Sequence, residues 1–458
     1  MSRSFAIILF CLLGVAVAAP FAAAAQPAAG PVVSVARPAA VSAAPFAAQP
    51  ASPGGPERLQ ALLDQKDYFR LRTALEQEGP SLDVEERAYF QAFVDNVFAR
   101  NAWSLKAVSA LLDTRAGTLT DKQRYGLWRL QEDNFYKMGQ YRQAVACCDT
   151  LLGTYGRLMD TAQREDLAND RVLWHALEDV PPQEVIVPAS VSVRWTRDVA
   201  GLMNVPVRKD TSTYDFIFDT GAGLSTISEG FAKHLGLRIR EIALDVQSST
   251  GVHNTSSLAV ADSLYLGAVL LKNVVFLVLP DAQLTFPPIH YSIKAILGLP
   301  VIWQLQEVHI RKEGTLTLES ADHPGPSNLA LDGWAPVISV VVNNDTLAFH
   351  FDTGASSTDL YSPYLERHRE EVLRKGKHQT SKRGGAGGIV ATEVYRLKDV
   401  PFRVGNRSFA LPQVDVLVHS TDDKGEKYYG NLGQDVFSRF PEMVLNFKYM
   451  YLNFPEVL

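Results

Sequence analysis

The chain contains few cysteines, three in 458 residues. Cys11 lies in the apolar run at the N-terminus, which leaves only the sequence neighbours Cys147 and Cys148. Adjacent residues on a helix point about 100° apart and are poorly placed to bond to each other. The sequence therefore predicts a mature protein that depends on neither disulfide bonds nor a cysteine metal site.

The chain also lacks a large excess of charge of either sign. Its 44 basic and 50 acidic residues give a net charge of −6, which provides no electrostatic case for a nucleic-acid or anionic-membrane partner. The ten histidines include no HExxH-like pair, so we do not expect a metal hydrolase. We also expect no cofactor and no bound metal. No stretch beyond the N-terminus is long and apolar enough to predict a stable membrane span.

Residues 1–25 have the pattern of a secretory signal peptide. Arg3 supplies the positive start, Phe5 to Ala18 is apolar, and a run of alanines precedes Gln26. The apolar run is short for a bilayer span, although a retained anchor stays open as an alternative. We expect an exported protein, located in the periplasm, in the cell envelope or outside the cell.

Residues 26–55 are mostly Ala, Pro, Val, Ser and Gly. Such a segment buries too little apolar surface to offset the entropy lost on ordering, so it is predicted to be a flexible linker.

Residues 56–180 change to a helical period. Apolar residues such as Leu59, Leu62 and Leu63 recur at spacings of three and four. The predicted interruptions between short antiparallel helices are Gly79-Pro80, Gly117, Gly139 and Gly153. The stretch from Leu130 to Leu152 resembles a tetratricopeptide helix pair, and a plain helical bundle is an equal alternative.

The rest of the chain has the alternation of β-strands, and it is duplicated into segments 185–322 and 334–458. Asp-Thr-Gly occurs at 219–221 and again at 352–354, each time after an apolar strand that closes a predicted hairpin. A glycine-bearing segment and then an apolar-Gly segment, Ile296-Leu297-Gly298 or Asn431-Leu432-Gly433, follow at matching distances. The two segments are therefore predicted to be two copies of one β unit.

Paired aspartates at the ends of matching strands suit one chemistry. Two carboxylates held close together cannot both ionise, so they share a proton and divide into an acid and a base. Asp219 and Asp352 are the candidates for this pair.

These motifs, in this order and in duplicate, resemble the aspartic peptidases. The resemblance is to retropepsin-like lobes joined in one chain, as in the pepsin-like enzymes, and it covers about Val185 to Leu458. It implies an all-β bilobal acid protease fold after the helical region, and an endopeptidase in which the two aspartates activate a water molecule. Asn431, where an apolar residue is usual, is the main local departure.

The resemblance also assigns roles around the aspartates. Thr220 and Thr353 would form hydrogen bonds across the lobes, and Gly221 and Gly354 let backbone N–H groups approach the carboxylates. Gly298 and Gly433 would pack behind the two loops. The predicted flap residues are Gly251, Val252, Gly384, Gly385, Gly387 and Gly388. Which of the two flaps dominates is left open.

The residue after each motif is alanine, Ala222 and Ala355, where pepsin-like enzymes often carry a hydroxyl. A hydroxyl there stabilises the ionised carboxylate and lowers its pKa. Without it, we expect a pH optimum nearer mildly acidic or neutral than strongly acidic.

Peptides or proteins are the expected partners, and the presence of both aspartates in one chain predicts a monomer. The helical region has three interpretations: it binds a partner protein, occludes the cleft as a prosegment, or braces the first lobe. The alternative to an enzyme is a catalytically inactive peptide-binding module built on the same fold.

Overall fold

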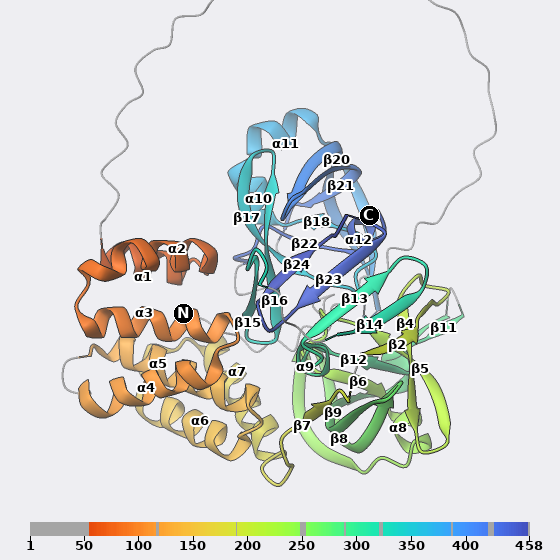
Figure 1. Ribbon diagram of the computed structural model, residues 1–458, viewed down its shortest axis with the longest axis horizontal. Helices are drawn as coiled ribbons and strands as arrows, with labels where there is room; N and C mark the ends of the chain where they lie inside the picture. Colours follow the sequence, from red (N-terminus) through yellow and green to blue (C-terminus); the bar gives the residue numbers. More distant parts are fainter. Residues whose placement is uncertain are drawn as a thin grey trace, which may run out of the picture.

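The computed structural model describes residues 55–115, 119–188, 190–247, 253–287, 290–319, 324–385, 388–419 and 426–456. The predicted signal peptide and nearly all of the predicted linker lie outside these ranges. Helices come first and two β-rich lobes follow, so the predicted fold class is confirmed (Figure 1).

The N-terminal region is built of helices that pack mainly against their neighbours in the chain. Three of them begin with reciprocal capping boxes, formed by Asp83 with Glu86, Thr120 with Gln123, and Asp160 with Gln163. The elements are α1 (Pro56–Asp64), α2 (Tyr68–Glu78), η1 (Gly79–Ser81), α3 (Val84–Val97), α4 (Asn101–Arg115), α5 (Asp121–Lys137), α6 (Tyr141–Tyr155), η2 (Gly156–Leu158) and α7 (Thr161–His175).

The predicted glycine interruptions have mixed outcomes. Gly139 follows α5 with a positive φ of 69°, a conformation that glycine adopts without strain. Gly153, by contrast, lies inside α6, so the predicted break there is wrong. An interior glycine costs a helix only about 1 kcal/mol, and the burial of apolar side chains such as Leu151 outweighs that cost. Gly117 lies outside the described residues.

The first lobe forms a nine-stranded sheet in the described residues, with a small hairpin beside it. The sheet contains β1 (Glu184–Ile186), β3 (Thr196–Arg197), β4 (Met203–Lys209), β5 (Ser212–Phe218), β6 (Ser225–Ser228), β7 (Ile239–Gln247), β8 (His253–Leu266), β9 (Val269–Leu279) and β12 (Ala295–Leu297). The hairpin is β10 (Thr285–Phe286) with β11 (Tyr291–Ser292), and the helical turns are α8 (Glu229–His234), η3 (Asp281–Leu284) and α9 (Leu299–Gln304).

The second lobe repeats this plan as an eight-stranded sheet in the described residues. Its strands are β15 (Leu329–Asp332), β16 (Ala335–Val342), β17 (Asp345–Phe351), β18 (Asp359–Leu360), β19 (Lys377–Gly385), β20 (Gly388–Val404), β21 (Arg407–Leu417) and β22 (Gly430–Leu432). Its helices are α10 (Ser362–Arg367), α11 (Arg369–Lys375) and α12 (Gln434–Phe437).

The two lobes share one topology. In the first, β12 lies parallel to β5 and antiparallel to β6, and β6 lies parallel to β9. In the second, β22 lies parallel to β17 and antiparallel to β18, and β18 lies parallel to β21. Each aspartate therefore follows a strand that pairs with the apolar-Gly segment of its own lobe, as expected for a duplicated unit.

A five-stranded sheet joins the lobes, in the order β2 (Val191–Arg194), β14 (Thr315–Leu318), β13 (Glu307–Arg311), β23 (Glu442–Asn446) and β24 (Tyr451–Asn453). The lobes meet where β13 of the first pairs antiparallel with β23 of the second, from Glu307 opposite Asn446 to Arg311 opposite Glu442. Figure 1 shows this interlobe sheet between the green first lobe and the blue second lobe.

The helical region contacts both lobes. On the second lobe, Asp332 accepts hydrogen bonds from Lys66 Nζ at 2.6 Å, Tyr68 Oη at 2.8 Å and Tyr428 Oη at 2.7 Å. On the first lobe, Arg240 donates to the carbonyl oxygen of Ala176 at 2.7 Å and pairs with Asp179. These contacts tie the helices to both halves of the β structure.

We expect Asp332→Ala to loosen the attachment of the helices. The Asp332 side chain is 7% exposed, so its removal leaves the buried partners without their shared acceptor. The free energy of unfolding should fall by about 3 kcal/mol, measured by chemical denaturation. The control is Asp210→Ala, which removes an aspartate that is 76% exposed and also pairs with a lysine. Equal effects of the two variants would contradict an anchoring role for Asp332.

No helix in the part of the chain that the structure describes is long and apolar enough to cross a membrane.

Candidate active site

The two Asp-Thr-Gly loops are held in place by the strands beside them. The backbone N–H of Asp219 donates to the carbonyl oxygen of Leu297 at 3.1 Å, and that of Asp352 donates to Leu432 at the same distance. Phe218 and Phe351, the last residues of the strands before the aspartates, are fully buried. Each aspartate is therefore presented at the end of a strand that is anchored in the core of its own lobe.

The two threonines link the loops across the lobes. Thr220 Oγ1 accepts from the backbone N–H of Thr353 and Thr353 Oγ1 accepts from that of Thr220, both at 3.0 Å. Each hydroxyl also donates to a carbonyl of the other lobe, Thr220 to Phe351 at 3.1 Å and Thr353 to Phe218 at 2.8 Å. These reciprocal hydrogen bonds fix the separation of the two loops. They have the arrangement that the resemblance implies.

The carboxyl groups of Asp219 and Asp352 lie together between these loops. A Cβ atom built on Gly221 would lie 2.5 Å from Cγ of Asp352, and one built on Gly354 would lie 2.5 Å from Cγ of Asp219. Each carboxyl group therefore rests against the glycine of the opposite lobe. Asp219 is fully buried and Asp352 is 1% exposed, so the pair is removed from bulk water.

Burial and mutual repulsion act on the proton affinity of this pair. The pKa of Asp352 is raised well above its usual value, first by burial, then by the charge of Asp219 and by a hydrogen bond with that carboxyl group. The backbone N–H groups of Gly354 and Ala355, 2.7 and 3.1 Å from Asp352 Oδ1, act in the opposite direction but are outweighed. In the first lobe, Gly221 N–H donates to Asp219 Oδ1 at 2.8 Å. The arrangement favours a proton retained between two acids.

The late glycines lie behind the loops. A Cβ on Gly298 would come within 2.6 Å of the backbone of Leu224, and one on Gly433 within 2.5 Å of the backbone of Ser357. The residues after these glycines donate backbone hydrogen bonds to the active loops, Leu299 to Ala222 at 2.8 Å and Gln434 to Ala355 at 2.9 Å. A side chain at Gly298 or Gly433 would therefore push its loop out of place.

Three residues outside the predicted set of site residues support the loops. Ser225 Oγ accepts from the N–H of Gly298 at 3.1 Å, and Thr358 Oγ1 accepts from that of Gly433 at 3.0 Å. Gln434 Nε2 donates to the carbonyl oxygen of Thr353 at 2.8 Å. The sequence held a signal for two of them, because Ser225 and Thr358 follow their aspartates at the same distance.

The strands that flank the predicted flap residues pair as antiparallel hairpins. In the second lobe, β19 and β20 pair from Lys377 opposite Arg396 to Gly385 opposite Gly388, which places Gly384, Gly385 and Gly388 at the closed end. Gly387 lies outside the described residues. In the first lobe, β7 and β8 pair up to Gln247 opposite His253, while Gly251 and Val252 lie outside the described residues.

A buried ion pair ties the second hairpin to the sheet below it. Arg383, next to the flap glycines, donates to both carboxylate oxygens of Asp359 in β18, at 2.5 and 2.6 Å. Burial raises the pKa of Asp359, and the guanidinium opposes that rise. The bidentate contact sets the position of the strand that leads to the flap tip.

Residues 205–301 match the family model described as Aspartyl protease. The match confirms the resemblance for the part of the first lobe that contains Asp219 and Gly298. No curated protein matches the sequence.

Among solved structures, the chain is similar to a retropepsin-like aspartic protease from Rickettsia conorii. The identity is 18%, and the similarity covers 29% of this chain and all of the other. The TM-score is 0.22. The second lobe lies outside the matched residues and repeats the strand topology of the first lobe.

Asn431 distinguishes the second lobe from the first. It is fully buried in β22, and neither its amide oxygen nor its nitrogen has a hydrogen-bond partner among the described residues. Its counterpart beside β5 in the first lobe is Ile296, also fully buried. The polar side chain thus occupies an apolar position of the repeat.

We expect Asn431→Ile to stabilise the protein. Burying polar groups without partners costs about 1–3 kcal/mol, and isoleucine removes that cost, so the free energy of unfolding should rise by a similar amount. The control is Asn328→Ile, because the Asn328 amide donates to the carbonyl of Leu452 at 3.1 Å and accepts from its N–H at 2.9 Å. Asn328→Ile should destabilise the protein. A lower melting temperature for Asn431→Ile would contradict the interpretation.

Proposed function

We propose that this protein is an aspartic endopeptidase. The paired carboxyl groups of Asp219 and Asp352 would activate the water molecule that hydrolyses the peptide bond of a substrate. The observation that supports the proposal most strongly is the placement of both carboxyl groups against the glycine of the opposite loop, with the loops joined by the reciprocal threonine bonds.

The proposed reaction needs no covalent intermediate. The ionised member of the pair takes a proton from a water molecule, which attacks the carbonyl carbon of the scissile peptide bond. The protonated member donates its proton to the carbonyl oxygen, which gives a tetrahedral gem-diol. The carboxyl group that took the proton of the water then passes it to the amide nitrogen, the other carboxylate takes a proton back from a hydroxyl of the gem-diol, and the C–N bond breaks to release the amine and the acid. The two acids titrate as one unit, and the raised pKa of Asp352 keeps that shared proton in place as the pH rises.

The hairpins beside the pair supply the proposed means of holding a substrate. A peptide bound in extended form would form backbone hydrogen bonds with the two flaps, and side chains on alternate sides would meet different subsites. The proposed substrates are therefore peptides or unfolded protein segments. Because both aspartates belong to one chain, the proposed enzyme is a monomer.

The helical region and the location of the protein belong to the same proposal. Contacts of the helices with Asp332 of the second lobe and Arg240 of the first favour a bracing role over that of a removable prosegment. Docking of a partner protein on its outer surface is compatible with that role. The export predicted from residues 1–25 would place the enzyme outside the cytoplasm.

The test is hydrolysis of denatured casein and of a peptide library by the purified protein, with and without pepstatin. Cleavage that pepstatin blocks is the expected result. Binding of the same peptides without any cleavage, across the acidic to neutral range, would contradict the proposal and support an inactive peptide-binding module.

We expect the pH–rate profile to peak in the mildly acidic to neutral range. Ala222 and Ala355 are fully buried and provide no hydroxyl to stabilise an ionised carboxylate, and the pKa of Asp352 is raised. The form with one shared proton, which is the active one, therefore persists to higher pH. An initial-rate profile that peaks only below about pH 3 would contradict this reasoning.

A further inference from the structure

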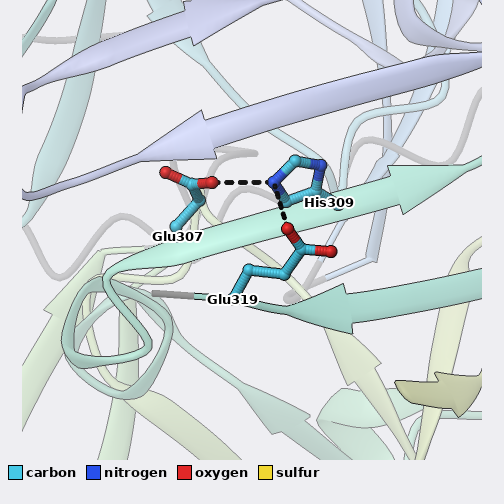
Figure 2. Close-up of side chains that lie close together, drawn as sticks. All are labelled: Glu307, His309 and Glu319. Carbon is cyan, nitrogen blue, oxygen red and sulfur yellow. Dashed lines mark hydrogen bonds and ion pairs between the residues drawn. The ribbon is translucent and has the colours of Figure 1, made fainter. Parts of the chain in front are cut away.

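A second group of titratable side chains lies on the interlobe sheet, outside the candidate active site. Figure 2 shows Glu307 and His309 on β13 with Glu319 just beyond β14. His309 Nε2 lies 2.8 Å from Glu307 Oε1 and 3.9 Å from Glu319 Oε2. One ligand atom of each residue lies within 4.8 Å of the others, so three oxygen and nitrogen donors converge on one point.

The strand register places two of these acids against each other. The register of β13 with β14 ends with Val308 opposite Leu318, and Glu307 and Glu319 are the residues that flank this last pair. Carboxylates so close together repel each other. The Glu307 side chain is only 7% exposed, which reduces the screening of its charge by water. A cation between the two carboxylates would turn this repulsion into attraction.

The neighbours of this group hold it in a form that can bind a cation. His309 Nδ1 lies 3.0 Å from Glu442 Oε1, and Glu442 is itself paired with Arg311 at 2.9 Å. The usual support of a metal-bound histidine is a carboxylate at the ring nitrogen that does not face the ion. Glu442 lies at that nitrogen here, while Nε2 faces Glu307 and Glu319. Glu307 Oε2 accepts from Asn446 Nδ2 at 2.5 Å, which orients the other carboxylate.

The charge balance points the same way. The carboxylates of Glu307, Glu319 and Glu442 surround His309, and the guanidinium paired with them in the described contacts is that of Arg311. A divalent ion among these acids would offset their mutual repulsion.

We propose that Glu307, His309 and Glu319 bind a divalent transition-metal ion of the zinc class. Two carboxylate oxygens and one imidazole nitrogen are ligands that Zn²⁺ accepts, with water in a fourth position. Bonds of about 2.0–2.1 Å in a tetrahedral site hold the ligand atoms about 3.3 Å apart, and the two observed distances from Nε2 lie on either side of that value.

The proposed ion has a structural role. Its ligands come from the first lobe, while Glu442, which orients His309, comes from β23 of the second lobe. Binding would therefore strengthen the sheet where the lobes pair. The sequence provided no reason to expect this metal site, because the search for one considered only an HExxH-like histidine pair. Glu307 and His309 instead share one face of a strand, and Glu319 reaches them only through the register.

The experiment measures zinc binding directly and does not depend on peptidase activity. The full chain is treated with a chelator, dialysed, and titrated with Zn²⁺ in competition with a chromophoric chelator. We expect saturable binding of one ion per chain and a higher melting temperature in its presence. Cobalt substitution should give the absorption bands of a tetrahedral site.

Variants identify the ligands. Glu442→Gln should weaken zinc binding about 10- to 100-fold, and Glu319→Gln and His309→Gln at least as strongly. Glu319 is 42% exposed, so its variant tests the site even if His309→Gln does not fold. The matched control is His175→Gln, which removes an exposed histidine beside Glu178 in the helical region.

Two results would overturn the proposal. One is the absence of saturable zinc binding in the unaltered protein, which would leave His309 as a hydrogen-bonding link between the carboxylates. The other is zinc binding that is unchanged by Glu319→Gln, or reduced as much by His175→Gln.

Discussion

Replacing Asp352 with asparagine is expected to abolish peptide hydrolysis and, at neutral pH, to make the folded protein more stable. The variant removes one of the two groups that exchange protons with the substrate and water, so kcat should fall by about 10⁴-fold. It also removes a buried acid that lies against Asp219. Loss of function with a gain in stability distinguishes an active-site acid from one that serves only the fold.

The pH dependence of the stability follows from the raised pKa of Asp352. Above the usual value of 3.8 and below the raised value, the folded protein keeps a proton that the unfolded chain has lost. The contribution of this group to stability is therefore complete at low pH and is lost as the pH rises through the folded pKa. Asp352→Asn cannot ionise, so its stability should not show this decline.

The measurement is a series of melting temperatures from acidic to neutral pH, together with initial rates on casein. Asp215→Asn is the control, because Asp215 lies on β5, the strand that leads to Asp219, but its side chain is exposed. It should leave both the rates and the pH profile unchanged. An Asp352→Asn variant that still cleaves casein, or that is less stable at every pH, would contradict the assignment.

Gly221→Ala is expected to cost both activity and stability, because there is no space for a methyl group. Its Cβ would lie 2.5 Å from Cγ of Asp352 and 2.6 and 2.8 Å from the two carboxylate oxygens. The loops would have to separate, which breaks the hydrogen bonds between Thr220 and Thr353. A misplacement of about 1 Å at a reacting centre costs about 10²-fold in rate, so kcat/KM should fall at least that far.

Gly223→Ala is the matched control for this prediction. It introduces the same methyl group two residues later, where the nearest atom is Cβ of Trp334 at 3.6 Å, an ordinary contact. We expect a small effect on kcat/KM and on the melting temperature. Equal effects of the two alanine variants would contradict the conclusion that activity depends on the close approach of Asp352 to Gly221.

The fold of the β half could be predicted largely from its repetition. The alternation of the strands before Asp219 and Asp352, together with the late glycines, was enough to indicate two copies of one unit, and the pairing of β12 with β5 and of β22 with β17 bears this out. The helical region was predicted less well. A glycine such as Gly153 weakens a helix only slightly, so its presence in the sequence does not decide whether the helix ends there.

The supporting residues of the site were harder to predict for a different reason. Ser225, Thr358 and Gln434 act through backbone groups on other strands, and a hydroxyl or amide in a sequence does not reveal which backbone group it meets. The same applies to Glu319, which reaches His309 only because β14 folds back on β13. Contacts of this kind depend on register, and register is set by the packing of whole strands.

The amino-acid order by itself determined the local features of this protein: the helical first part, the duplicated strands, and a carboxylate with a small, turn-forming neighbour at the end of each copy. Periodicity and turn chemistry act between residues close in the chain, so they can be read there. Only the tertiary structure decided that Asp219 and Asp352 face each other, that Thr220 and Thr353 bind across the lobes, and that Glu307, His309 and Glu319 meet on the interlobe sheet. Those distances depend on how the two lobes pack, and that packing is the sum of many weak contacts between residues far apart in the sequence.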